Sequence, residues 1–182
     1  MVNGTPILSS DAELAELSGL VPRVAGEAPE AYRRTVVEAL IALELRWQDL
    51  EAGAISSRTT VDLDAAWEAT VRRAGGQEML HDKLATAGLT EIPLRGLVKR
   101  AAVVEAYVAI RFAPFARPTG REVEQLWQEE AAKARASGKP VPPLEEVRSR
   151  VEDVVRERKL TGEVERWTQE LARRAEVVRY LR

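Results

Sequence analysis

Residues 29–53 read PEAYRRTVVEALIALELRWQDLEAG. Apolar side chains recur in this stretch at steps of three and four residues, at Tyr32, Val36, Leu40, Leu43, Trp47 and Leu50. That spacing places them on one stripe of an α-helix, which Val37 and Ile41 widen. Pro29 suits the first turn of such a helix, and Gly53 suits its end. The segment is therefore predicted to be the central core helix of the protein.

The same apolar spacing recurs along most of the remaining chain, between Gly, Pro and capping residues. Further helices are predicted to begin near Ser10, Asp62 or Thr60, Thr90, Thr119 and Leu144, and Met79, Leu80 and Leu84 mark a short helix that ends at Gly88. Strand signals are confined to residues 2–8, where Gly4 and Pro6 limit the segment to an edge strand or an extended arm. The sequence predicts an all-α, multi-helix fold with a long C-terminal helix.

Residues 138–143, GKPVPP, form the clearest linker in the chain. They divide the prediction into a helical core, residues 1–137, and a C-terminal helix, residues 144–182, that completes the same domain. We expect residues 147–155 and 167–178 to pack back onto the central helix. Gly162 predicts a break or bend in the C-terminal helix.

Composition excludes several classes of function. The chain has 182 residues, 45% of them hydrophobic, which is enough for one folded domain. Its formal net charge is -2 and its charges are interspersed, so a nucleic-acid partner is not expected. There is no cysteine, and no apolar run approaches the roughly 18–20 residues of a membrane span. The first twenty residues lack a basic, apolar leader, which leaves both a cytosolic protein and a mature secreted chain open.

A search for catalytic groups finds little. His81 is the only histidine, whereas a zinc site needs about four ligands. No G-x-S-x-G motif is present to carry a serine nucleophile. Gly75-Gly76 and Gly138-Lys139-Pro140 do not match a phosphate-binding loop and are interpreted as helix terminators. The sequence therefore predicts no catalytic residue, no metal and no cofactor.

The four tryptophans, at positions 47, 67, 127 and 167, lie on apolar stripes, where core packing is the ordinary role. Trp127 is the exception, because it lies near a connector, residues 112–118, that contains Phe112 and Phe115. Two interpretations stay open at this point. The aromatic cluster either binds extended apolar peptides or fixes the connector to the core.

Several motifs recur in an order that is characteristic of one family. They are Val2-Asn3-Gly4 with Pro6-Ile7 and Ser10-Asp11, Val36–Leu45, the helix with Trp67 and Gly75, Leu80–Leu84, Ala87–Thr90, Leu94–Ile110, Arg117–Thr119 with Glu122-Val123 and Trp127, and Trp167–Val177. In this order, over nearly the whole chain, the sequence resembles the N-terminal domain of the SurA-type periplasmic chaperones, which are related to the parvulin-bearing PrsA foldases. The parvulin domain itself has no counterpart, since only residues 137–143 separate the helix that contains Trp127 from the closing helix.

The resemblance implies an ATP-independent chaperone, or holdase, without isomerase activity. Its partners would be extended apolar segments of unfolded secreted or outer-membrane proteins, and its location would be the periplasm or another extracytoplasmic space. The groove residues expected to bind a client are Leu94, Val98, Phe112, Phe115, Val123 and Trp127. A small ribbon between residues 177–181 and 2–7 is a further expectation. The alternative is a structural module that forms a homodimer by exchanging its C-terminal helix.

Overall fold

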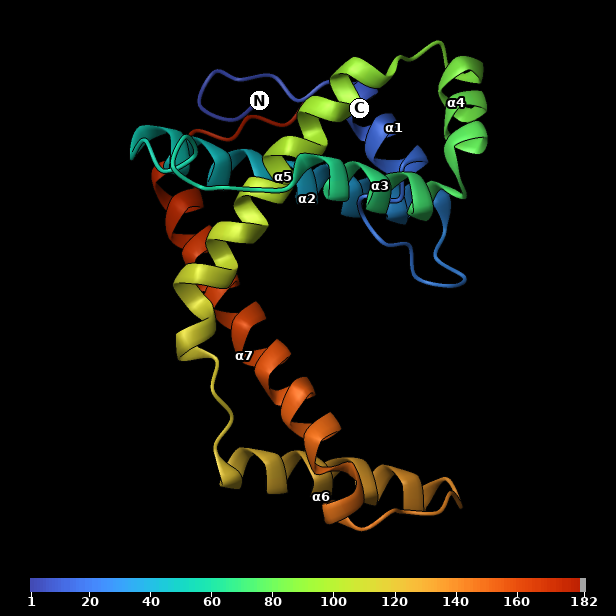
Figure 1. The fold of residues 1–182 in the computed structure, drawn as a ribbon, viewed down its shortest axis with the longest axis vertical. Coiled ribbons are helices and arrows are strands. Elements are labelled where there is room, and N and C mark those ends of the chain that lie inside the picture. The colour runs from blue at the N-terminus through green and yellow to red at the C-terminus, as the bar shows by residue number, and fades with distance from the viewer. Residues whose placement is uncertain (181–182) are drawn as a thin grey trace. The chain divides into compact units, whose positions relative to one another are not determined.

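The computed structural model describes residues 1–180, and these residues are helical with short connections (Figure 1). The elements are α1 (Ser9–Leu17), α2 (Pro29–Ala52), α3 (Leu63–Ala74), α4 (Gln77–Thr86), α5 (Glu91–Phe112), the 3₁₀ turn η1 (Ala113–Phe115), α6 (Gly120–Ala136) and α7 (Leu144–Arg174). Within this part of the chain the only β-type pairings are isolated bridges. The predicted all-α class with a long C-terminal helix is confirmed.

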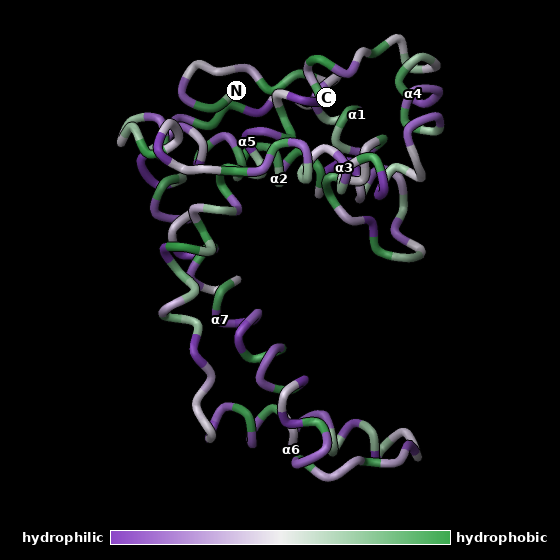
Figure 2. Tube along the Cα trace, in the orientation of Figure 1, coloured by the Kyte–Doolittle hydropathy of each residue, from purple (hydrophilic) through white to green (hydrophobic). Residues whose placement is uncertain are grey.

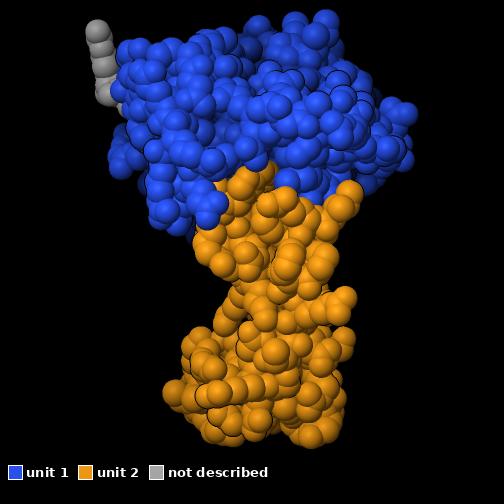
Figure 3. Space-filling model, turned by 90° about the vertical axis from the view of Figure 1, so that its left-hand side faces the viewer, with its two compact units in different colours: residues 1–107, 168–182 blue, residues 108–167 orange. Residues whose placement is uncertain are grey.

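The chain divides into two compact units (Figure 3). Unit 1 comprises residues 1–107 and 168–182, and unit 2 comprises residues 108–167. Both boundaries fall inside helices, α5 and α7. The predicted linker, residues 138–143, lies within unit 2, where it joins α6 to α7 as the turn of a helical hairpin.

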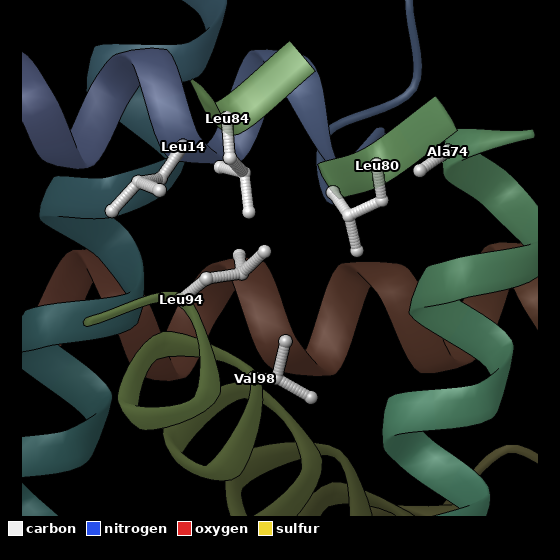
Figure 4. Packing of buried hydrophobic residues seen from close by; sticks show 6 residues of the cluster. All are labelled: Leu14, Ala74, Leu80, Leu84, Leu94 and Val98. Atoms are coloured by element: carbon white, nitrogen blue, oxygen red, sulfur yellow. The ribbon is translucent and has the colours of Figure 1, made fainter. Parts of the chain in front are cut away.

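The core of unit 1 is shared by four of its helices. Leu14 of α1, Leu80 and Leu84 of α4, and Leu94 of α5 point toward one another and are almost fully buried, and Ala74 of α3 joins the same cluster (Figure 4). A second cluster joins α1 to α2, through Ala12, Ala15, Tyr32, Val36 and Leu40. Of the apolar stripe predicted for residues 29–53, Tyr32, Val36, Leu40 and Leu50 are buried, whereas Leu43 and Trp47 are half-buried.

Most helix ends follow the predicted local chemistry. The Asp62 carboxylate accepts a hydrogen bond from the Ala65 amide at 2.9 Å and caps α3. Gly75 ends α3 with φ of 102°, a left-handed conformation that favours glycine. The first helix differs, because it begins at Ser9 and the carboxylate that serves its N-terminus is Asp11, bonded to the Leu8 amide at 2.7 Å. The helix was expected to begin near Ser10, and it begins one residue earlier.

The two ends of the described chain meet in unit 1. Val2, fully buried, forms an antiparallel bridge with Val177, and the Met1 and Val178 main chains exchange hydrogen bonds of 2.8 and 2.9 Å. The backbone N–H of Asn3 donates a hydrogen bond to the Glu176 carbonyl at 2.9 Å, and its side-chain Oδ1 accepts one from the Glu176 backbone N–H at 2.8 Å. The predicted ribbon is reduced to this contact, because Asn3 and Gly4 have positive φ and turn the chain back on itself. Leu181 lies outside the described residues.

The C-terminal end of α7 also contacts α2 within unit 1. Arg46 donates a hydrogen bond to the Thr168 hydroxyl at 2.8 Å, and Arg179 forms an ion pair with Glu38 at 2.9 Å. This agrees with the expectation that residues 167–178 return to the central helix.

Unit 2 holds the other part of α7, which packs against α6. Val155 of α7 is buried with Val123 and Leu126 of α6, and Leu144 and Val151 adjoin them. Residues 147–155, which were expected to pack on the central helix, pack on α6. Hydrophilic residues predominate along α7, with single hydrophobic ones between them (Figure 2). The helix continues through Gly162 without the predicted break.

Candidate apolar groove between α6 and α7

A groove of about 510 Å³ lies in unit 2 between α6, α7 and the turn that joins them. Nine of its lining residues are apolar, namely Leu126, Trp127, Ala131, Ala134, Val141, Pro142, Val147, Val151 and Val154. The remaining three are Glu130, Arg150 and Arg158. We call this surface the α6/α7 groove. Its volume falls in the range of small-molecule and peptide side-chain sites, and its walls are predominantly hydrophobic.

The groove follows from the residue pattern of the two helices. On α7, Val147, Val151 and Val154 repeat at steps of four and three, and so share one face. Val155, one residue further round the helix, points into the core with α6 instead. Because the hairpin is only two helices thick, the valine face of α7 has no third helix to cover it within unit 2. Val154 accordingly remains 37% exposed.

Trp127 fixes the turn end of the groove. Its indole Nε1 donates a hydrogen bond to the Pro142 carbonyl at 3.1 Å, which satisfies the one polar atom of the side chain. The ring is half-buried and forms part of the groove wall. Pro142 and Val141 continue that wall, so the turn is itself part of the site.

The three charged residues of the groove differ in whether they have an ion-pair partner. Glu130 is paired with Lys133 at 2.7 Å. A hydrogen bond from Lys133, with a smaller contribution from the charge of Arg158, lowers the pKa of Glu130. Within residues 1–180, neither Arg150 nor Arg158 is within ion-pair distance of a carboxylate. The edge of the groove therefore presents two guanidinium groups that are free to bind an anion.

A polar cluster next to the groove holds the two helices together. Thr119 and Glu122 form a capping box at the start of α6, with the Thr119 amide donating to Glu122 at 2.7 Å. Lys159 of α7 binds the same carboxylate at 2.9 Å and the Arg117 carbonyl at 2.9 Å. The Lys159 hydrogen bond, aided by those from Thr119, lowers the pKa of Glu122 to about 2. The start of α6 and the middle of α7 thus meet at the Glu122 carboxylate, and Lys159 also ties the Arg117 main chain to them.

The structure separates the six residues predicted to bind a client. Leu94 and Val98 belong to the core of unit 1, and Val123 belongs to the core of unit 2. Phe112 is also buried, with its ring 5.5 Å from that of Trp167. These four side chains pack the interior and do not form an exposed groove.

Phe115 and Trp127 have different surroundings. Phe115 is 67% exposed on η1, but it does not line the α6/α7 groove. Trp127 does line it, so one of the six predicted residues falls in the site. Sequence reasoning missed the valine face of α7 and the arginines beside it. The signal was present, since valines at steps of four and three after a proline-rich turn indicate an apolar face on an otherwise polar helix.

One further carboxylate is buried, but it is already engaged. Glu44 on α2 is 6% exposed, accepts from Arg100 at 3.0 Å and accepts from Gln48 at 2.7 Å. These partners hold it as a structural anion in unit 1. Among residues 1–180, no group of three or more Asp, Glu or His side chains is placed to hold a metal ion. No helix in that range is long and apolar enough to cross a membrane.

No family of known proteins matches this chain, and neither curated proteins nor solved structures contain a significant match.

Proposed function

We propose that this protein is an ATP-independent chaperone that holds apolar segments of unfolded polypeptides in the α6/α7 groove. The observation that carries the proposal is the groove itself, whose lining is three-quarters apolar and includes an exposed valine and an oriented tryptophan. Such a surface recognises hydrophobic side chains without needing a particular sequence.

The size of the groove suggests weak and reversible binding. Burying two or three apolar side chains contributes roughly 3–9 kcal/mol. Association and ordering of a flexible chain cost about 4–15 kcal/mol. The surplus is at most about 5 kcal/mol, so dissociation constants of roughly 0.2 mM or weaker are expected. Weak binding of this kind suits a holdase, which must release its client without nucleotide hydrolysis.

The cellular location is part of the proposal. The resemblance of the ordered motifs to the SurA-type chaperones supports clients that are unfolded secreted or outer-membrane proteins, in the periplasm or another extracytoplasmic space. The absence of cysteine is compatible with an oxidising compartment.

The test is suppression of aggregation of an unfolded β-barrel protein, followed by light scattering. We expect the full chain to reduce scattering at a few-fold molar excess, and Val154→Glu to reduce this protection strongly. The matched control is Val24→Glu, which places the same charge at a valine that is 70% exposed in unit 1 and should protect as well as wild type. Val24→Glu should keep the wild-type melting temperature, and Val154→Glu should lower it by only a few degrees, because Val154 is 37% exposed.

Two results would overturn the proposal. One is no protection by the wild-type chain at several-fold excess. The other is equal protection by wild type and Val154→Glu. Sedimentation at several concentrations tests the rival assignment, in which α7 exchanges between two copies. A stable dimer that buries the groove would favour an assembly module over a chaperone.

A further inference from the structure

We propose that the α6/α7 groove selects an acidic amphipathic helix. This is a narrower class of client than apolar segments in general. This inference rests on the proposed function and concerns the same site. It is carried by three features of the groove: the backbone of its walls, its length and the charge of its edge.

The backbone of the walls disfavours an extended ligand. The groove is bounded by α6, α7 and a proline-containing turn, and the main chain of a helix interior already bonds to itself. The Pro142 carbonyl is used by Trp127. An extended peptide laid here would find no strand edge to pair with its amides, and each unpaired group would carry a desolvation cost. A helix satisfies its own backbone and needs only apolar contacts from the groove.

The length of the groove matches a short helix. Its α7 wall extends from Val147 to Arg158, about 16 Å at 1.5 Å per residue, and its α6 wall from Leu126 to Ala134, about 12 Å. Two to three turns of a third helix fill that length. Apolar side chains at steps of three and four would then contact the valine face of α7 and the Trp127 end of the groove. The result is a three-helix packing that unit 2 lacks within itself.

The edge of the groove supplies charge complementarity. Arg150 and Arg158 are eight residues apart, about 12 Å along α7, which is the spacing of two carboxylates seven or eight residues apart on a ligand helix. At about 100° per residue, Arg150 lies roughly 140° around α7 from Val155, the residue packed on α6. It therefore lies on the outer edge, where a ligand would be. Glu130 offsets this charge only in part, since it is bound to Lys133 and interacts more weakly with Arg158.

The test uses fluorescein-labelled peptides of about 14 residues and measures anisotropy with the full chain. The first peptide has leucines at helical spacing with glutamates beside them, seven residues apart. The second replaces each glutamate by lysine, and the third has the composition of the first in an order that destroys the helical spacing. We expect the first to bind at least about threefold more tightly than the other two at low salt, and to lose that advantage as salt is raised.

Charge reversal on α7 should reverse this preference. The double variant Arg150→Glu with Arg158→Glu should bind the glutamate peptide about tenfold more weakly and the lysine peptide more tightly. Arg148→Glu is the control, because Arg148 is exposed on the same helix but does not line the groove, and it should keep the wild-type order. Far-UV circular dichroism of the mixture should show added helix for the first peptide.

The outcomes separate the two proposals. Equal binding of the glutamate and lysine peptides, or of the ordered and reordered peptides, would overturn the acidic-helix inference and leave the chaperone proposal standing. Binding of no peptide, together with no protection of an unfolded protein, would overturn both. A dimer at the assay concentration that is abolished by Val154→Glu would show that a second copy of this chain occupies the groove, and would also overturn the inference.

Discussion

Among the polar residues of α2 that are not buried, Gln48 is the one whose replacement by alanine should destabilise unit 1 most. Gln48 connects the turn at the start of the chain to the buried carboxylate of α2. Its Nε2 donates to Glu44 at 2.7 Å and to the Val2 carbonyl and the Thr5 hydroxyl at 3.2 Å each, and its Oε1 accepts from the Asn3 amide group at 2.8 Å. Asn3 in turn bonds to the Glu176 main chain.

The magnitude follows from these contacts. Two N–H groups cannot serve three acceptors at full strength, so we count two donated bonds and one accepted bond. A neutral bond contributes about 0.5–1.5 kcal/mol net, and one to a charged group about 1.5–3 kcal/mol. The sum is about 2.5–6 kcal/mol, and water that reaches the half-exposed site after truncation reduces it to roughly 2–3 kcal/mol. For a chain of this length, that lowers the melting temperature by about 4–12 °C.

Calorimetry of Gln48→Ala beside Gln128→Ala measures the effect. Gln128 is exposed on α6 with one hydrogen bond of 3.4 Å, so its replacement should change stability by no more than about 0.5 kcal/mol. Hydrogen exchange at the Asn3 and Val178 amides should accelerate in Gln48→Ala and stay unchanged in Gln128→Ala. If the two variants melt within about 2 °C of each other, Gln48 does not hold the termini in place and the reasoning fails.

Three further predictions concern other parts of the chain. Because the pKa of Glu122 is lowered to about 2, its bond to Lys159 stabilises unit 2 at neutral pH and is lost as the pH falls from about 4.5 to about 2. The difference in urea midpoint between wild type and Glu122→Gln should therefore shrink across that interval. A difference that is independent of pH would contradict this prediction. Gly75→Ala should lower the stability by at least about 1 kcal/mol, since φ is 102° and the new Cβ would lie 2.6 Å from the Met79 sulfur. Gly162→Ala within α7 meets no neighbour and should raise the stability by up to about 1 kcal/mol. Thermal melts of both variants measure the two effects. Val123→Ala should cost about 2 kcal/mol in urea titration because Val123 is 1% exposed, while Val154→Ala in the groove wall should cost less than half as much.

The fold was largely predictable because its determinants are local. The apolar spacing of residues 29–53 indicated a buried helix, and Tyr32, Val36 and Leu40 are indeed in the core. Asp62 begins α3 through its side-chain cap, and Gly75 ends it through its left-handed backbone. Gly162 shows the limit of such reasoning. A single glycine costs a helix only about 1 kcal/mol, which the packing on either side of it in a 31-residue helix outweighs.

The groove was harder to predict because it depends on which faces pair. Periodicity shows that Val147, Val151 and Val155 are apolar helix positions, but it does not show which helix covers them. Residues 147–155 were expected on the central helix and instead pack on α6. Leu94, Val98, Val123 and Phe112 were expected to be accessible, and each is buried by neighbours that are distant in sequence. Trp127 was predictable, because a tryptophan on a short apolar face beside proline-rich segments has few places to be buried.

The N-terminal motif and the groove carry different kinds of information about this protein. Asn3 and Gly4 adopt positive φ, and Asn3 bonds to Gln48 and Glu176, so the residue types of the opening segment are explained by the closure of unit 1. Any helical protein that returns its last segment to its first could use the same turn. Val147 and Val154 of the valine face, and Arg150 and Arg158 beside them, have no such structural explanation, since α7 packs on α6 through Leu144, Val151 and Val155. Experiments on Val154, Arg150 and Arg158 therefore test what the protein binds, whereas substitutions in the opening segment test only how it folds.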